Sequence, residues 1–240
     1  MPNGMLDISD VIVDVYHGND VDFTSLKAAG IVGIIHKASQ GENTRDKLYR
    51  TRRDKALEMG FLWGAYHFSS AGDVQDQVKN FLKAIQWGEN PDRDRTTLLS
   101  LDFEPSGKVT KKDTNGNPII GADGKPVKIP LPDMTLDQAN DFVTEIHTIT
   151  NRWPMVYGGR LLRESVAHAN NAIALAKCPL WYARYADTPS GLPVHIWPAY
   201  TLWQYTDGKD GPEPRTVNGK KIDRDTFQGS VDNLRARWPF

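Results

Sequence analysis

The chain has 240 residues, of which 39% are hydrophobic and 25% are charged, and its formal net charge is −1 at pH 7. This length is enough to bury the core of one large domain, and the balanced charge argues against a nucleic-acid-binding surface, which needs clustered positive charge. The single cysteine, Cys178, excludes an internal disulfide and cysteine-rich zinc sites, and no apolar run approaches the ~20 residues that cross a bilayer, so we expect no membrane insertion.

Five segments in the first two thirds of the chain have the composition of short buried strands. They cover residues 11–15, 31–38, 61–68, 96–104 and 155–158. Between them, 73–87 and 135–150 repeat apolar residues with the 3.6-residue period of a helix, and the second begins with the capping-box pattern Thr135-x-x-Gln138. Residues 44–59 and 160–176 are further helix candidates. Alternation of strands and helices predicts right-handed crossovers and a parallel sheet.

The pattern changes after residue 178. Residues 179–185, 200–206 and 220–227 have strand character, but the gaps between them are too polar and too rich in glycine and proline for helices. Five β/α units and three further strands give eight strands, which is enough to close a barrel. The sequence therefore predicts an α/β fold: an irregular TIM-like barrel of five β/α units followed by three strands that lack helices.

Residues 105–133 do not fit this pattern, because they run for about thirty residues without a helical period. Within them, GADGKPVKIP suggests a small hairpin around Asp123 and Gly124. We interpret this excursion as a lip on a cleft rather than a domain boundary, so that residues 1–240 form a single domain.

The stretch TTLLSLDFEP ends its apolar run in two acids, Asp102 and Glu104. Side chains alternate along a strand, so both carboxyl groups share the face of Ser100, about 6–7 Å apart at Cβ, and this face would point into the barrel. Such a pair can hold one protonated acid beside one ionised carboxylate. The alternative is a strand-end pair that is simply solvated.

Other predicted strands also carry polar or aromatic side chains near their ends. Asp14 ends the first strand and Asp223 lies in the last. Aromatic rings stack on the faces of sugar rings, and carboxylates bind hydroxyl groups and perform acid–base steps, so the barrel rim is suited to a glycan. The candidates for glycan contacts are Tyr66, Tyr157, Trp181, Tyr185, Trp203 and Gln204, whereas we assign Trp63 and Trp153 to the core.

Seven short stretches occur in the following order along the chain: VDVYHGNDVDF, HKASQG, GFLWGAYHF, LDFE, PLWYARY, LWQYTDG and GKKIDRDTF. Together they resemble the glycoside hydrolase family 25 lysozymes, also called Chalaropsis-type muramidases. The resemblance implies a distorted barrel that hydrolyses the β-1,4 bond between N-acetylmuramic acid and N-acetylglucosamine in peptidoglycan. Two positions depart from the family pattern: Tyr16 stands where a serine is common, and Gln40 where a glutamate is frequent.

The resemblance also implies roles for the acids. Glu104 would be the general acid that protonates the glycosidic oxygen. Asp102 would stabilise positive charge on the sugar or orient the substrate's own acetamido group for attack on the anomeric carbon, as in substrate-assisted glycosidases. Asp14 and Asp223 would be supporting carboxylates. The implied partner is the glycan strand of peptidoglycan, bound by a monomer without a cofactor.

Two other interpretations remain open. A metal-dependent hydrolase could use His17, His36 and His67 near three strand ends, but the sequence has no His-x-His or His-Glu-x-x-His pattern, and we expect no metal site. A barrel that binds cell-wall glycan without cutting it is the second alternative.

Residues 1–10 have neither a basic region nor an apolar core, so no signal peptide is expected. We expect action on the cell wall, periplasmic or extracellular, with phage lysis or a secretion system as delivery routes.

Overall fold

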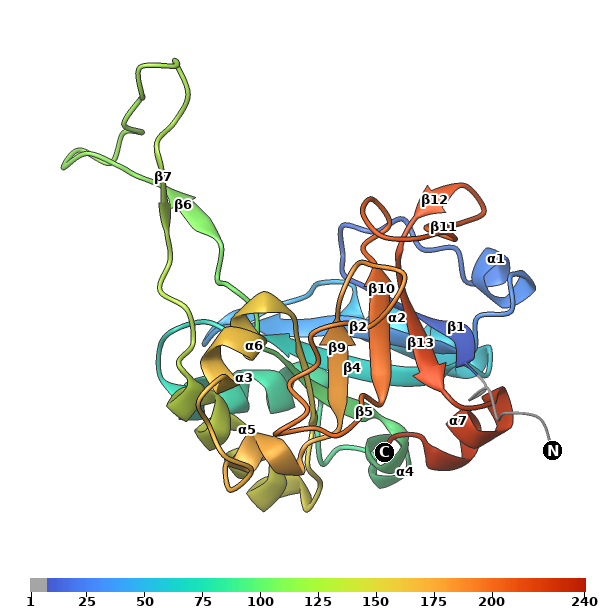
Figure 1. Cartoon of the computed structure of the whole chain (residues 1–240). Helices are drawn as coiled ribbons and strands as arrows, with labels where there is room; N and C mark the ends of the chain where they lie inside the picture. Colours follow the sequence, from blue (N-terminus) through green and yellow to red (C-terminus); the bar gives the residue numbers. More distant parts are fainter. Residues whose placement is uncertain (1–7) are drawn as a thin grey trace.

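The computed structural model describes residues 8–240, and its main feature is a closed barrel with a long projecting arm (Figure 1). The expectation about a signal peptide falls largely on residues 1–7, which lie outside the described part. Across residues 8–240, no helix combines the length and apolarity that spanning a membrane would require.

Eight strands close the barrel, as the sequence predicted. In spatial order they are β1 (Ile8–Val15), β13 (Asp223–Gln228), β10 (Leu202–Thr206), β9 (Leu180–Ala183), β8 (Met155–Gly158), β5 (Leu98–Asp102), β4 (Leu62–Phe68) and β2 (Gly33–Gln40), and β1 also pairs with β2. Neighbouring strands are parallel except for β13, which is antiparallel to both β1 and β10. The short strand β3 (Thr44–Arg45) extends β2 at one side.

The predicted last strand, 220–227, begins later than expected. Lys220–Lys221 form β12, which pairs with β11 (Thr216–Val217) in a separate hairpin outside the barrel. Asn218 and Gly219 turn this hairpin, both with a positive φ, in the manner of a tight two-residue turn. The barrel strand therefore begins at Asp223 itself.

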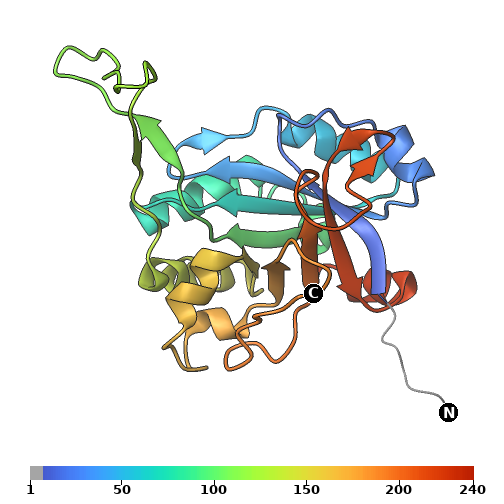
Figure 2. The same cartoon turned by 45° about the horizontal axis from the view of Figure 1, so that its top comes forward.

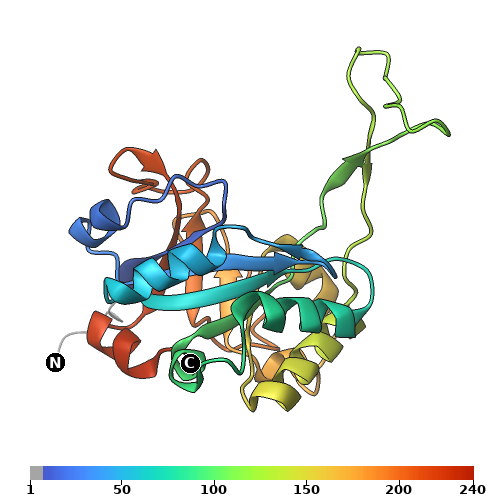
Figure 3. The same ribbon diagram turned by 180° about the vertical axis from the view of Figure 1, so that it is seen from behind.

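Helices cover the outside of the barrel, and Figure 3 shows α2 (Tyr49–Glu58), α3 (Val74–Ile85) and α5 (Leu136–Thr150) on one side. The two helices predicted from clear periodicity, α3 and α5, are confirmed. Asp73 caps α3 by accepting from the Asp76 N–H, and Thr135 and Gln138 form the expected capping box at α5.

The two weaker helix predictions were too long. Residues 44–59 contain β3 and an Asp46 turn before α2 begins, because the Asp46 carboxylate accepts from the Leu48 N–H. Residues 160–176 split into α6 (Arg160–Val166) and a 3₁₀ turn, Ala174–Lys177. Three short helices were not predicted: α1 (Phe23–Ala28), α4 (Pro91–Thr96) and α7 (Val231–Arg237). Helix α4 ends where the predicted strand 96–104 was to begin, so β5 starts only at Leu98.

The core has two layers because side chains alternate along each strand. Inward-facing residues such as Ile12, Met155 and Phe227 fill the barrel, and outward-facing Leu101 and Phe103 pack in the layer beneath the helices. Trp63 is buried in that outer layer, as predicted. Trp153 is only partly buried and stacks on His147 with 4.1 Å between the ring centroids.

Residues 105–133 form the arm. Strands β6 (Lys108–Thr110) and β7 (Lys128–Pro130) pair antiparallel, and the hairpin expected around Asp123 and Gly124 is present. The arm begins at the rim where β5 ends and extends away from the barrel, as Figures 1 and 2 show. It therefore does not fold over the barrel mouth as the lip that the sequence suggested.

Candidate active site

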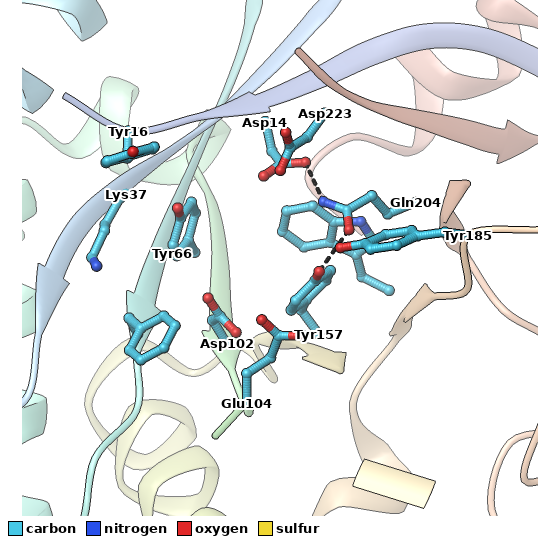
Figure 4. A pocket seen from close by; sticks show the side chains of 12 residues that line it. Asp14, Tyr16, Lys37, Tyr66, Asp102, Glu104, Tyr157, Tyr185, Gln204 and Asp223 are labelled. Atoms are coloured by element: carbon cyan, nitrogen blue, oxygen red, sulfur yellow. Dashed lines mark hydrogen bonds between the residues drawn. The ribbon is translucent and has the colours of Figure 1, made fainter. Parts of the chain in front are cut away.

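A pocket opens at the carboxyl-terminal ends of the parallel strands, and Figure 4 shows the side chains that line it. Nine of the ten predicted site residues line this pocket: Asp14, Asp102, Glu104, Asp223, Tyr66, Tyr157, Trp181, Tyr185 and Gln204. Three further residues complete the lining: Tyr16, Lys37 and Phe68. The barrel thus brings together residues from both ends of the described chain.

The strand geometry explains why Asp102 and Glu104 share the pocket. Strand β5 ends at Asp102, but the Phe103 N–H still donates to the Tyr157 carbonyl of β8, at 2.9 Å. The extended backbone therefore continues for one residue, with Phe103 turned into the outer core and Glu104 turned inward.

The other two acids meet across an antiparallel pair. Asp14 near the end of β1 lies directly opposite Asp223 at the start of β13. Because β13 runs against the other strands, its first residue and not its last reaches the rim that carries the pocket. This orientation was not predicted from the sequence.

Hydrogen bonds fix the floor of the pocket. Gln204 donates from Nε2 to the Asp14 carboxylate and accepts from the Tyr157 hydroxyl, both at 2.6 Å. Trp181 donates from Nε1 to Asp225 at 2.6 Å. Asp225 is fully buried and was missed in the sequence, although it lies two residues after Asp223 on the same strand face.

Burial and mutual repulsion raise the pKa values of these carboxyl groups. Burial raises the pKa of Asp14 well above its usual range, and the charges of Asp223 and Asp225 raise it further. Burial, with the charges of Asp207 and Glu104, raises the pKa of Asp223 to about 7. The pocket therefore retains protons on some of its carboxyl groups near neutral pH.

The β5 pair has unequal surroundings. Burial raises the pKa of both Asp102 and Glu104, and the charge of Glu104 raises that of Asp102 further. Lys37 acts in the opposite direction on Asp102, because a nearby cation favours the ionised carboxylate. Within residues 8–240, one oxygen of Asp102, Oδ1, is buried without a hydrogen-bond partner. That oxygen therefore has acceptor capacity that no group in the described residues uses.

Trp203 was predicted to line the site, but its side chain faces the other side of β10. Trp203 and Gln204 are neighbours on β10, so their side chains face opposite sides, and Gln204 faces the pocket. Trp203 instead packs in the outer core against Tyr205 and donates from Nε1 to the Arg184 carbonyl at 2.8 Å.

The three histidines considered as metal ligands each have other partners. His17 lies 2.8 Å from the Asp46 carboxylate, His36 contacts the Lys37 carbonyl, and His67 lies between the side chains of Ser39 and Gln77. Residues 8–240 contain no group of three or more His, Cys, Asp or Glu side chains arranged to hold a metal ion.

Comparisons with known proteins agree with this architecture. The family model described as glycosyl hydrolases family 25 matches residues 13–213. The chain is 27% identical to Lysozyme M1 of Streptomyces globisporus, covering 93% of this chain and 69% of that protein. It is 25% identical to N,O-diacetylmuramidase of Chalaropsis sp, covering 90% and 92%.

Two solved structures have the same fold. A muramidase from Acremonium alcalophilum matches with a TM-score of 0.67 and 27% identity, covering 93% of this chain and 96% of the other. A family GH25 lysozyme from Aspergillus fumigatus matches with a TM-score of 0.67 and 25% identity, covering 96% and 98%. The family match includes most of the barrel and the acids on β1 and β5, so the chain belongs to the glycosyl hydrolases of family 25 and is a glycoside hydrolase.

Proposed function

We propose that this glycoside hydrolase is an N-acetylmuramidase, which cleaves the β-1,4 bond between N-acetylmuramic acid and N-acetylglucosamine in peptidoglycan. Family membership and the similarity to lysozymes and muramidases support hydrolysis of peptidoglycan. The observation that carries the finer proposal is the β5 pair, in which Asp102 and Glu104 enter one pocket in unequal surroundings.

Glu104 is the general acid in this proposal. Burial raises the pKa of its carboxyl group, so the group keeps a proton that it can give to the glycosidic oxygen as the bond to the anomeric carbon breaks. The same carboxylate then takes a proton from the water that completes hydrolysis. A positioned general acid typically contributes a factor of 10²–10⁴ to the rate.

Asp102 acts as the ionised partner. Burial and the charge of Glu104 raise the pKa of Asp102, and Lys37 opposes this rise, so in this proposal Lys37 is the group that holds Asp102 ionised. Asp102 lines the pocket, where its carboxylate can accept a hydrogen bond from the acetamido N–H of the sugar. Held in this way, the acetamido oxygen attacks the anomeric carbon in a substrate-assisted step. In the other route, Asp102 stabilises the positive charge that develops on the sugar.

The remaining pocket residues support the sugar and the acids. Asp14 is fixed by Gln204, and Asp223 lies opposite Asp14, so both can accept hydrogen bonds from sugar hydroxyl groups or position the β5 pair. The rings of the groove give apolar faces for stacking on pyranose rings, and they are Tyr66, Tyr157, Trp181 and Tyr185.

We further propose that the protein acts as a monomer on glycan strands of the cell wall, in the periplasm or outside the cell, after delivery by phage lysis or a secretion system.

The test is digestion of purified peptidoglycan by the wild type, Glu104→Gln and a control, Glu58→Gln. Glu58 is an exposed glutamate at the end of α2, away from the pocket. We expect mass spectrometry to find fragments with muramic acid at their reducing ends in the wild-type and control digests, and a loss of 10²–10⁴ in rate for Glu104→Gln. Glucosamine reducing ends or peptide cuts would refute the assignment of the cleaved bond. A fully active Glu104→Gln would refute the assignment of Glu104 as the general acid.

A further inference from the structure

The groove continues past Glu104 into a second hollow with a different charge. Its lining includes Glu104 and Tyr185, which also line the first pocket, so the two hollows meet at the proposed acid. Figure 4 labels both shared side chains, Glu104 below Tyr157 and Tyr185 to its right. A glycan bound across this junction places the sugar that is attacked in the first pocket and the leaving sugar toward the second.

Three arginines line the second hollow: Arg160, Arg163 and Arg184. Arg160 and Arg163 lie three residues apart on α6, and therefore on one helix face, whereas Arg184 directly follows β9. Gly159 and Ala183 also line the hollow, and their small side chains leave space beside the guanidinium groups.

The arginines differ in how they are held. Arg163 donates from Nη1 to the hydroxyl of Tyr182 at 2.9 Å, and this fully buried tyrosine donates to the Ser190 carbonyl at 2.8 Å. Arg160 forms an exposed ion pair with Glu164 at 2.9 Å. Within residues 8–240, the guanidinium group of Arg184 has no hydrogen bond or ion pair. It is therefore free to bind a ligand.

The two hollows have opposite electrostatic character. The first contains four carboxyl groups and one lysine, and the second has three guanidinium groups against Glu104 and Asp210. Anionic substituents of a bound polymer are repelled by the first hollow and attracted by the second. A guanidinium group presents parallel N–H donors that match a carboxylate or a phosphate, so the second hollow is suited to either anion.

We propose that this arginine hollow binds the carboxylate groups of the peptide stem on the leaving-group side of the glycan. The inference rests on the proposed function, because cleavage after muramic acid leaves a glucosamine next to the acid and a stem-bearing muramic acid one sugar further. The stem is the anionic part of the repeating unit itself. Phosphate groups of a polymer attached to the wall share the same chemistry and are distinguished by the test.

The test compares Arg184→Gln with a control, Arg235→Gln, on stem-bearing peptidoglycan. Arg235 is exposed on α7, which follows the far end of the antiparallel strand β13, so the control removes one positive charge from the end of the barrel opposite the pocket. All substrates are stripped of phosphate-containing polymers, and one portion has its stem carboxylates converted to amides.

We expect kcat/KM for free-carboxylate substrate to fall about tenfold in Arg184→Gln and to change little in the control. On the amidated substrate, wild type and Arg184→Gln should be equal. Equal loss on both substrates, or loss on neither, would overturn the proposal. So would an effect of Arg184→Gln that appears only when the phosphate-containing polymer is left in place.

Titration calorimetry with soluble stem-bearing fragments separates this inference from the proposed function. Binding that weakens about tenfold both on amidation and in Arg184→Gln supports the arginine hollow, even if the wild type cuts no glycan. If the affinity depends on neither change, the proposal that the arginine hollow binds stem carboxylates is overturned, even if the wild type is an active muramidase.

Discussion

Asp14 and Asp223 lie directly opposite each other in the antiparallel pair of β1 and β13, the first and last strands of the barrel. Burial raises the pKa of both carboxyl groups, and the charges of Asp223 and Asp225 raise the pKa of Asp14 further. Two ionised carboxylates this close repel each other, so the closed barrel makes the folded state sensitive to pH.

The pH dependence of stability follows from the sign of these shifts. The pKa of Asp223 is raised from 3.8 to about 7 in the folded protein, so the folded state retains a proton that the unfolded state has lost. Stability from this group is fully present below about pH 4 and is lost as the pH rises through about 7. One pKa unit corresponds to about 1.4 kcal/mol, so the effect is of the order of a few kcal/mol.

We therefore expect Asp223→Asn to reduce the decline in unfolding free energy between pH 4 and 8, measured by urea denaturation at a series of pH values. Asp141→Asn is the matched control, because Asp141 is an exposed acid on α5 outside the pocket. A decline in Asp223→Asn as steep as in the wild type would contradict the assignment.

Lys37 sets the lower pH limit of activity in the proposed mechanism. Its ammonium group donates to Gln40 at 2.6 Å and lies 4.6 Å from the centre of the Phe68 ring, and its charge lowers the pKa of Asp102. Replacing Lys37 by Met removes this charge, so the pKa of Asp102 rises. We expect the acidic limb of the kcat/KM profile to move to higher pH.

Lys37→Arg is the control, because it keeps the positive charge and should leave the acidic limb near its wild-type position. The profiles are measured on soluble glycan fragments from pH 3 to 9. An unchanged limb in Lys37→Met would show that Asp102 does not have to be ionised for the reaction.

Tyr185 and Trp203 should respond differently to substitution, although the sequence predicted both as glycan contacts. Tyr185 is 39% exposed in the groove, whereas Trp203 is 7% exposed in the outer core. We expect Tyr185→Ala to raise KM several-fold with little change in the urea midpoint, because it removes a stacking face. Trp203→Phe should cost about 1–3 kcal/mol of unfolding free energy, because it leaves the Arg184 carbonyl without its donor. If Trp203→Phe raised KM more than Tyr185→Ala did, Trp203 rather than Tyr185 would be the residue that contacts the glycan.

The alternation of side chains explains what the sequence could predict about the site. It placed Asp102 and Glu104 on one face, and the same rule separates Trp203 from Gln204, which were both selected because they lie in one aromatic-rich stretch. The rule also points to side chains that were missed. Tyr16 lies two residues after Asp14, and Phe68 two residues after Tyr66.

Tertiary pairing explains what the sequence could not predict. Periodicity reveals the long amphipathic helices α3 and α5, but α1 has six residues and is too short to show a period. The direction of β13 depends on partners at the other end of the chain, so no local pattern places Asp223 beside Asp14. The arm has turn signals, which predicted its hairpin, but no pattern that predicts where it points.

The arm offers a test of whether residues 105–133 contribute to the barrel. Its base is closed by the Leu131 N–H, which donates to the Gly107 carbonyl at 2.9 Å, and by the Ser106 N–H, which donates to Asp133 at 2.7 Å. In the described structure the residues from Lys108 to Pro130 are largely exposed and none of them lines the pocket.

Replacing 108–130 by an Asn-Gly turn should therefore change the unfolding free energy by about 0.5 kcal/mol or less and preserve kcat/KM on short soluble fragments. Asp133→Ala, which removes the acceptor at the base, is the comparison and should cost about 1 kcal/mol in the same urea titration. Loss of cooperative unfolding in the shortened chain would show that the arm supports the barrel, and slower digestion of intact walls alone would assign the arm to contact with the wall.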